Sequence, residues 1–251
     1  MTATATPLLE VQQLHKRFGG VVATDGVDLR IDGGEVHALI GPNGAGKTTL
    51  VAQLAGQLTP DAGRILFDGA DITTWPAHQR ARRGLARSFQ ITRLFSSFSV
   101  VEHLALALQA NSGSSFGAWR PVSCDAALWE RAHAQVAALG LTDRVDASVE
   151  VLSHGQRRAL EVGMAMAASP RLVLLDEPMA GMGPDESARM EALIARLAQQ
   201  TTVLLIEHDV DAVFRLAHRV SVLVSGRIIA SATPDEVRRD AQVIGAYLGQ
   251  E

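Results

Sequence analysis

The chain has 251 residues, with 23 lysines and arginines against 27 aspartates and glutamates, so its formal net charge is −4 at pH 7. Its 47% apolar and 20% charged residues predict one large or two small globular domains and exclude a disordered or collagen-like polymer. A slightly acidic chain lacks the basic surface that sequence-independent DNA binding requires, so we expect no nucleic-acid partner.

The cysteine count and the apolar runs favour a cytosolic location. Cys124 is the single cysteine, so it cannot form an internal disulfide, and no Cys/His cluster has zinc-site spacing. No apolar run approaches the roughly 18 residues that a membrane-spanning helix requires. The segment Met1–Pro7 lacks the basic and apolar stretches of a secretion signal and is expected to be a frayed end. Contact with a membrane would then require a partner protein.

The first hundred residues predict a mixed β region with one helix. Short apolar runs predict strands at Leu8–Leu14, Val27–Ile31, Val36–Ile40 and Arg64–Phe67. The alternation in the second run is typical of a half-exposed antiparallel strand, whereas the continuous third run indicates burial on both faces. A helix is expected to start at Lys47–Thr49 and to end near Gly56, which can serve as its C-cap.

The middle of the chain has a helical pattern. Between Ile91 and Ala168, the expected helices are Val100–Gln109, Asp125–Leu139 and Leu160–Ala168. The segment Asn111–Pro121 is rich in serine and glycine, so we expect an exposed loop there.

After Pro170 the pattern alternates between strands and helices. In order, the expected elements are strand Leu172–Leu175, helix Pro184–Ala198, strand Val203–Ile206, helix Asp209–Ala217 and strand Val220–Val224. Alternation of this kind predicts a parallel sheet covered by helices.

A phosphate-binding loop is predicted between the third strand and the first helix. It consists of Gly41, Pro42, Asn43, Gly44, Ala45, Gly46, Lys47 and Thr48, with Thr49 following. Two glycines separated by four residues precede a lysine and a hydroxyl residue, as in nucleotide-binding loops, and successive N–H groups at a helix start can bind polyphosphate. Lys47 would contact the outer phosphates, and the Thr48 hydroxyl would bind Mg²⁺. The alternative is a glycine-rich turn before an ordinary helix.

Two features of the sequence bear on which nucleotide binds and how many sites there are. An Asn-Lys-x-Asp guanine reader is absent from the sequence, which argues against a small GTPase. The chain shows no internal repeat, so we expect one nucleotide site per chain.

A pair of carboxylates follows the apolar strand Leu172–Leu175. A buried strand that ends in Asp176 and Glu177 delivers both side chains to the sheet edge where the phosphate loop also emerges. Adjacent residues point to opposite sides, so they can take separate roles. We expect Asp176 to hold Mg²⁺ through water and Glu177 to polarise the water that attacks the γ-phosphate. The alternative is a pair that merely caps a strand.

The segment Leu152-Ser153-His154-Gly155-Gln156 makes the chain resemble the ATP-binding cassette (ABC) family. Members carry Leu-Ser-Gly-Gly-Gln at the start of a helix shortly before the acidic strand, and here His154 stands where glycine is usual. The resemblance implies that Ser153, Gly155 and Gln156 bind the nucleotide held by a second subunit, and therefore an ATP-sandwiched dimer. Taken alone, Ser153 could be an ordinary helix N-cap.

The resemblance assigns roles to three further residues. Phe18 would stack on adenine, Gln90 would reach the Mg²⁺ shell and join the catalytic core to the helical region, and His208 would contact the γ-phosphate. Taken alone, Phe18 could be a core aromatic and His208 a surface or core histidine. With Lys47 and Glu177, Gln90 and His208 make up the expected catalytic residues.

The resemblance covers residues 8–249 and implies an α/β fold. The implied architecture is a P-loop NTPase cassette with a RecA-like mixed or parallel sheet core, an antiparallel β subdomain and an inserted helical subdomain at residues 91–168.

Four segments resemble the ATPase subunits of branched-chain (hydrophobic) amino-acid importers: residues 86–95, 177–182, 206–209 and 243–249. The implied protein hydrolyses ATP with Mg²⁺, pairs with an identical or related ATPase subunit, and drives integral-membrane permeases from the inner face of the plasma membrane. A periplasmic solute-binding protein would act with it indirectly. The resemblance leaves open a lipopolysaccharide-export ATPase and a non-transport ABC protein acting on ribosomes or nucleic acid. A regulator without turnover is disfavoured because Glu177 and His208 are both present.

An arginine cluster and an apolar segment lie near Gln90. Arg80, Arg82, Arg83 and Arg87 predict a solvated helix face and turn, or else the border of the groove that receives the membrane partner. The candidates for lining that groove, or for core packing, are Leu94, Phe95 and Phe98.

Overall fold

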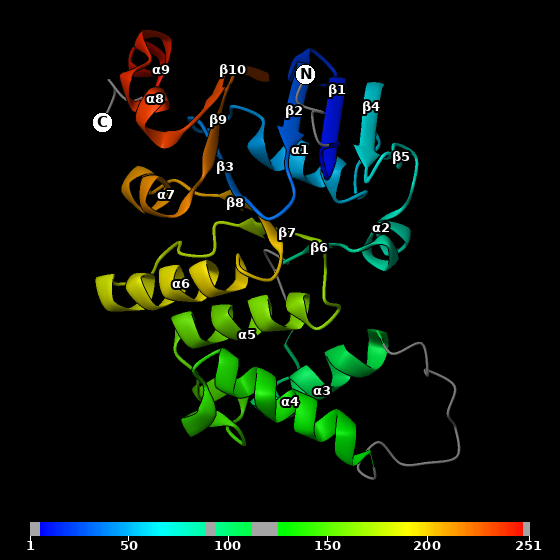
Figure 1. The fold of residues 1–251 in the computed structure, drawn as a ribbon, viewed down its shortest axis with the longest axis vertical. Helices are drawn as coiled ribbons and strands as arrows, with labels where there is room; N and C mark the ends of the chain where they lie inside the picture. Colours follow the sequence, from blue (N-terminus) through cyan, green and yellow to red (C-terminus); the bar gives the residue numbers. More distant parts are fainter. Residues whose placement is uncertain (1–5, 89–93, 112–124, 248–251) are drawn as a thin grey trace.

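The computed structural model describes residues 6–88, 94–111 and 125–247, and these residues form two sheets and a group of helices (Figure 1). The smaller sheet is antiparallel. Its strands are β1 (Leu9–Phe18), β2 (Val21–Ile31), β4 (Ala62–Phe67) and β5 (Ala70–Asp71), in the order β2-β1-β4-β5. β1 pairs antiparallel with both β2 and β4.

β2 is longer than its sequence pattern predicts. The alternation of buried and exposed residues from Val27 to Ile31 is as expected, but the strand begins at Val21. Val21 and Val22 are 67% and 44% exposed, and the one buried residue before Val27 is the polar Thr24, so the first half of the strand carries no alternating apolar signal.

The larger sheet is mixed. Its strands are β3 (Val36–Ile40), β6 (Leu85–Arg87), β7 (Leu172–Asp176), β8 (Thr202–Ile206), β9 (Arg219–Val224) and β10 (Arg227–Ala232), in the order β10-β9-β3-β8-β7-β6. β10 pairs antiparallel with β9, and all the other neighbouring strands are parallel. Every residue of β3, β7 and β8 is buried, which confirms the expectation of a sheet covered on both faces.

Helices connect and cover these strands. The α-helices are α1 (Lys47–Leu54), α2 (Ala77–Arg83), α3 (Val100–Asn111), α4 (Ala126–Ala138), α5 (His154–Met166), α6 (Pro184–Leu197), α7 (Val210–Leu216), α8 (Pro234–Arg239) and α9 (Ala241–Ala246). Two 3₁₀ turns, η2 (Thr142–Arg144) and η3 (Val149–Val151), lie between α4 and α5.

Three hydrophobic clusters hold these layers together. The side chains of α1 pack between the antiparallel sheet and one face of the larger sheet, together with Leu174 and Leu204. Residues of α3, α4, α5 and α6 pack on the opposite face, with Val173 and Leu205. Neighbouring residues of one strand therefore serve different cores, as the alternation of side chains along a strand requires. A third cluster joins β9 to α7, α8 and α9.

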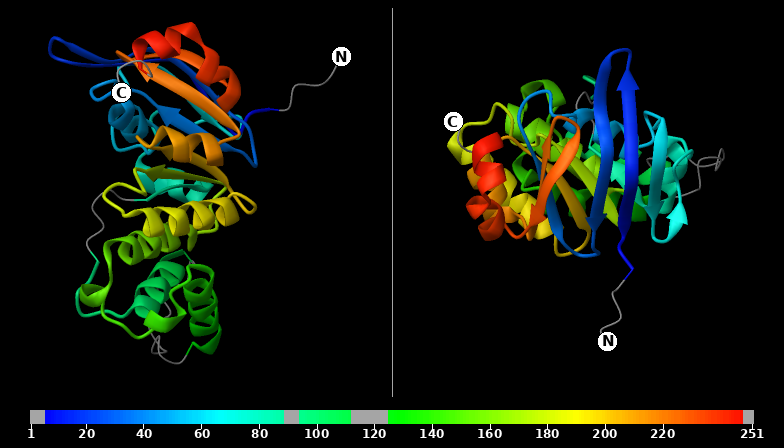
Figure 2. Two further views of the ribbon diagram at one scale, coloured as in Figure 1. Left: turned by 90° about the vertical axis from the view of Figure 1, so that its left-hand side faces the viewer. Right: turned by 90° about the horizontal axis from the view of Figure 1, so that it is seen from above.

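The helices α3 and α4 lie at one end of the molecule and the antiparallel sheet lies at the other (Figures 1 and 2). α5 and α6 run side by side between α3–α4 and the larger sheet (Figure 1). The boundaries 8–249 for the whole domain and 91–168 for the inserted part stay predictions.

One helix starts earlier than expected. The prediction of a helix from Leu160 is wrong at its start, because α5 begins at His154. Ser153 is the N-cap and forms a reciprocal capping box with Gln156, which fixes the first turn although that turn is polar.

Candidate nucleotide-binding site

The loop from Gly41 to Gly46 connects the buried strand β3 to α1, and its glycines are required by their backbone shape. Gly41, Gly44 and Gly46 have φ values of 151°, 78° and 105°. A Cβ atom on Gly41 would lie 1.9 Å from a carbonyl oxygen of β9, and one on Gly46 would lie 2.1 Å from a carbonyl oxygen of β2. Nothing lies within 4 Å of the corresponding position on Gly44. The loop is therefore pressed against two strands and open at its middle.

The start of α1 is available to an anion. Its N-cap is Gly46, which provides no side-chain acceptor, so no side chain caps the first-turn N–H groups. Thr48 and Asn43 are exposed, Pro42 and Thr49 are half-buried, and Ala45 is buried. The hydroxyl of Thr48 is thus accessible beside uncapped N–H donors.

Lys47 folds back over the loop. It is 7% exposed, and its Nζ donates hydrogen bonds to the carbonyls of Gly41 at 2.5 Å and Pro42 at 3.0 Å. Burial lowers the pKa of Lys47, while the nearby carboxylates of Glu177 and Asp176 raise it. The structure therefore brings a buried cation and both predicted carboxylates together.

The last residue of β7 has a cationic partner. The Asp176 side chain is 3% exposed, and its Oδ2 accepts a hydrogen bond from Nη2 of Arg87 at 2.7 Å. Arg87 lies on β6, next to β7, and its Nη1 donates to Oε1 of Gln57. The prediction that Arg87 is solvated is wrong, because its side chain is only 10% exposed and holds this carboxylate in place.

Glu177 and His208 meet across the ends of β7 and β8. Oε1 of Glu177 lies 2.7 Å from Nε2 of His208, and both side chains are accessible, at 28% and 44%. Glu177 has a φ of +49°, in the left-handed region, and its N–H donates to the carbonyl of Ile206 at 2.9 Å. Two polar side chains are thus held within hydrogen-bonding distance at the carboxyl edge of the sheet, where ligands of such sheets bind.

The oxygen atoms at this edge fit a magnesium ion only with help from a ligand. Within the described ranges, no group of three or more His, Cys, Asp or Glu residues could hold a metal ion. Thr48 and Asp176 supply a hydroxyl and a carboxylate, which are hard oxygen donors of the kind that Mg²⁺ takes alongside phosphate oxygens. Gln90, the third predicted metal contact, lies outside the described residues.

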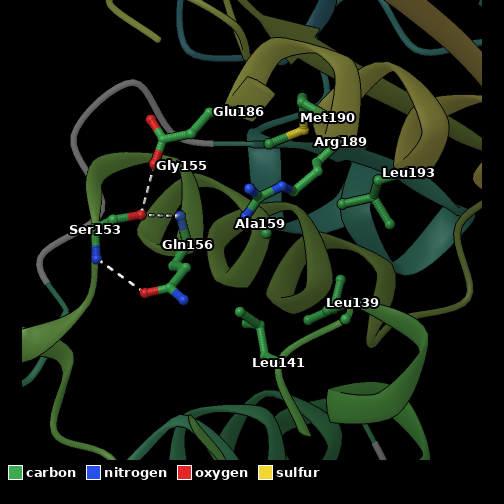
Figure 3. Close-up of a pocket in the computed structure, with 11 residues that line it drawn as sticks. Leu139, Leu141, Ser153, Gly155, Gln156, Ala159, Glu186, Arg189, Met190 and Leu193 are labelled. Atoms are coloured by element: carbon green, nitrogen blue, oxygen red, sulfur yellow. Dashed lines mark hydrogen bonds between the residues drawn. The ribbon is translucent and has the colours of Figure 1, made fainter. Parts of the chain in front are cut away.

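Ser153, Gly155 and Gln156, the signature residues, lie at the start of α5 and line a pocket with residues of α6 (Figure 3). Oγ of Ser153, at the start of α5, donates to Oε1 of Glu186 in the first turn of α6 at 2.7 Å. A Cβ atom on Gly155 would lie 2.9 Å from the carboxyl carbon of Glu186, so a larger residue there would displace the Glu186 side chain. Ser153, Gly155 and Gln156 line a cavity of about 80 Å³, and none of its described lining residues belongs to the phosphate loop.

Two residues near this cavity were not assigned a role from the sequence. Glu186 contacts Ser153, and the sequence feature that could have drawn attention to Glu186 is its position in the first turn of a predicted helix. His154, which replaces the usual glycine, has its Nε2 3.1 Å from the carbonyl oxygen of Ala180. The substituted signature residue therefore contacts the loop that follows Glu177.

Phe18 is not a core residue. It ends β1, is 50% exposed, and has Nζ of Lys16 5.7 Å from its ring centroid. An exposed ring of this kind is available for stacking on a planar ligand.

The arginine cluster divides by burial. Arg82 and Arg83 are exposed as expected, but Arg80 is 1% exposed and donates only to main-chain carbonyls among its described contacts. The expectation of a solvated face is therefore wrong for Arg80. In the apolar segment, Phe95 is 53% exposed and its ring centroid lies 5.2 Å from that of Phe98.

A family model described as "ABC transporter" matches residues 24–180 of the chain. The chain belongs to the ABC transporter family. A second model, described as "Branched-chain amino acid ATP-binding cassette transporter", matches residues 227–251. Among the described residues of this ABC cassette, no helix combines the length and apolar character needed to cross a bilayer.

Relatives align over nearly the whole cassette. The branched-chain amino acid transport ATP-binding proteins BraF of Pseudomonas aeruginosa and LivG of Escherichia coli are 39% and 38% identical, each covering 97% of this chain and 98% of the relative. The lipopolysaccharide export system ATP-binding protein LptB of Haemophilus influenzae is 32% identical with the same coverage.

Solved structures agree with this assignment. The ADP conformation of MJ1267, an ATP-binding cassette of an ABC transporter, has a TM-score of 0.86 at 29% identity and covers 98% of this chain and 100% of that one. CbiO1 from Clostridium perfringens, part of an ABC transporter complex, has a TM-score of 0.81 at 28% identity, covering 97% and 95%. The α/β cassette fold and the ATPase class that the sequence resemblance implied are thereby confirmed.

Proposed function

We propose that this cassette is the ATP-hydrolysing subunit of an importer for branched-chain or related amino acids. The observation that carries this choice is the match of residues 227–251 to the branched-chain amino acid transporter model, in a chain 38–39% identical to BraF and LivG. In this proposal the subunit acts at the cytoplasmic face of the membrane through permease subunits, and a periplasmic solute-binding protein delivers the solute to them.

The phosphate loop would bind the triphosphate of ATP. The uncapped N–H groups at the start of α1 face the negative charge, and Lys47 would exchange its two carbonyl partners for the outer phosphates. Thr48, Asp176 and Gln90 would hold Mg²⁺, which supplies charge neutralisation on the phosphates when bound. The exposed ring of Phe18 would stack on the adenine.

Glu177 and His208 would carry the hydrolytic step. Glu177 would accept a proton from the attacking water as the water oxygen bonds to the γ-phosphorus and the bond to the bridging oxygen breaks, which releases ADP. His208 would contact the γ-phosphate during this step. Their contact of 2.7 Å supports a common site, because one residue can orient the other. Arg87 would keep the Asp176 carboxylate in a fixed position through their ion pair.

A second cassette would complete each site. Ser153, Gly155 and Gln156 line a cavity that includes no described residue of the phosphate loop, which supports a role toward the nucleotide of another chain. Two cassettes would close on two ATP molecules and reopen after hydrolysis, and the permease helices would follow this motion. Such coupling requires ATP to bind the closed state better than the open one.

Transport by the reconstituted complex tests the proposal. The chain would be purified with the permeases and the solute-binding protein encoded by neighbouring genes and placed in proteoliposomes. We expect ATP-dependent uptake of labelled leucine, isoleucine or valine, and loss of uptake with Lys47→Ala. An active ATPase that imports none of these solutes would contradict the proposed substrate class, and one that co-purifies with ribosomes instead of permeases would contradict the transport function.

A further inference from the structure

Glu207, the residue that precedes His208, is a buried carboxylate with both oxygens engaged by the main chain. It is 3% exposed. Its Oε1 accepts a hydrogen bond from the N–H of Met179 at 2.8 Å, and its Oε2 accepts one from the N–H of His208 at 3.1 Å. Burial raises the pKa of Glu207, while these two N–H donors lower it. A carboxyl group is retained here although burying it is unfavourable.

The first of these bonds restrains the turn that contains Glu177. A left-handed conformation costs a residue with a side chain about 1–2 kcal/mol, so the φ of +49° at Glu177 needs support from its surroundings. The N–H of Glu177 donates to Ile206, and the N–H of Met179 donates to Glu207. Both restraints come from the end of β8.

The second bond restrains the segment that contains His208. The N–H of His208 donates to the same carboxylate that holds the N–H of Met179. Both N–H groups thus donate to the one Glu207 side chain, and the side chains of Glu177 and His208 approach to 2.7 Å.

We propose that Glu207 is a positioning residue for ATP hydrolysis, whose carboxylate ties the turn carrying Glu177 to the segment carrying His208. The proposal rests on the hydrolytic roles proposed for Glu177 and His208. A glutamine has the same size but only one acceptor oxygen, so in either orientation its NH₂ group faces one of the two N–H donors. Glu207→Gln therefore breaks one end of the tie without creating a cavity.

Steady-state kinetics with Mg-ATP test this role. For Glu207→Gln we expect kcat to fall at least 10-fold, while KM and the dissociation constant of ATP stay within 2-fold, because Glu207 contacts neither α1 nor the phosphate loop among its described hydrogen bonds. Glu191→Gln makes the same chemical change at a carboxylate that pairs with Arg215 on the surface, and its kcat should stay within 2-fold of the parent. An unchanged kcat in Glu207→Gln would overturn the proposal.

A second measurement separates positioning from folding. If Glu207→Gln does not fold, Glu207→Asp keeps the charge but is one methylene shorter and cannot span both donors, so it must show the same loss of kcat at constant KM. Equal kcat per folded molecule in Glu207→Asp, with a lowered midpoint of thermal unfolding, would assign the residue a structural role only and overturn the proposal.

A double-mutant cycle separates this inference from the function it rests on. If Glu207 acts through Glu177, adding Glu207→Gln to Glu177→Gln should change the residual hydrolysis less than 2-fold. Full turnover in Glu177→Gln would contradict the proposed role of Glu177 itself. An inactive Glu177→Gln beside a fully active Glu207→Gln would contradict the tie alone.

Discussion

Arg80 offers a direct test of how the helix that follows the phosphate loop is held. Its guanidinium donates to the carbonyls of Trp75 at 2.9 Å, Gln53 at 2.7 Å, Leu54 at 2.8 Å and Thr73 at 2.9 Å. Gln53 and Leu54 lie at the C-terminal end of α1, where a cation compensates the helix dipole. Burial lowers the pKa of Arg80 to about 10, so the side chain stays protonated at neutral pH.

Arg80→Ala removes all four bonds and leaves their carbonyls buried. Hydrogen bonds to a charged group contribute about 1.5–3 kcal/mol each. The four contributions cannot simply be summed here, because burying the one guanidinium that makes all four bonds has its own free-energy cost. Leaving a buried carbonyl unpaired costs about 1–3 kcal/mol where no other donor reaches it, so we expect a total loss of about 3–5 kcal/mol, against a total stability of about 5–15 kcal/mol. For a domain of this size, that loss lowers the melting temperature by on the order of 10 °C.

Urea unfolding followed by circular dichroism measures this loss. Arg82→Ala is the matched control, because Arg82 lies two residues away on the same helix and is exposed, and its effect should stay within about 0.5 kcal/mol. A loss below about 1 kcal/mol for Arg80→Ala would show that the carbonyls of α1 find other donors, and would refute the reasoning.

Three further predictions concern the contact between Ser153 and Glu186, the glycine loop before α1, and the half-buried Glu35. Glu186→Gln keeps an acceptor for Ser153 but removes a negative charge beside the start of α5. The ATP concentration for half-maximal dimer formation should therefore fall several-fold at low salt and less at high salt. The same ratio of variant to parent at both salt concentrations would contradict this. Gly46→Ala should destabilise the chain by several kcal/mol in urea unfolding, whereas Gly44→Ala should cost about 1–2 kcal/mol, because only the former meets a carbonyl oxygen, at 2.1 Å. Burial raises the pKa of Glu35, but hydrogen bonds from His37 and from a main-chain N–H outweigh this and hold the pKa below its ordinary value of 4.5. The ionised Glu35 therefore stabilises the fold fully above pH 4.5, and this stabilisation is lost as the pH falls through the lowered pKa. Glu35→Gln should accordingly flatten the acid side of the curve of unfolding free energy against pH.

Much of the central sheet could be predicted from the sequence because its strands are buried throughout. β3, β7 and β8 are short runs of apolar residues bounded by polar ones, and this pattern has few other interpretations. The shorter or half-exposed strands escaped prediction for the opposite reason. β6 has three residues, and β10 has no fully buried position.

The helix α5 shows where periodicity misleads. Its first turn is polar because its N-terminus faces solvent, so the apolar pattern starts only at Ala159 and Leu160. The spacing of Ser153 and Gln156 was the signal for the true start, since a capping box satisfies the free N–H groups of the first turn.

The sequence motifs singled out the predicted phosphate loop and the two carboxylates, but they could not reveal which side chains and main-chain groups contact these residues. The pairing of Asp176 with Arg87 joins residues 89 positions apart, and two of the carbonyls that accept hydrogen bonds from Arg80 lie more than 20 positions away. Clustered charged residues are usually exposed. The side chains of Arg80 and Arg87 are largely buried instead, because the tertiary structure supplies hydrogen-bond acceptors for their guanidinium groups.

A structure of the Glu177→Gln variant crystallised with Mg-ATP tests the central claim of a shared site most directly. The account predicts a dimer in which Oγ of Ser153 has left Glu186 and donates to the γ-phosphate of ATP bound by the phosphate loop of the partner subunit. A nucleotide-loaded crystal in which Ser153 still contacts Glu186 and lies far from every bound ATP would contradict it.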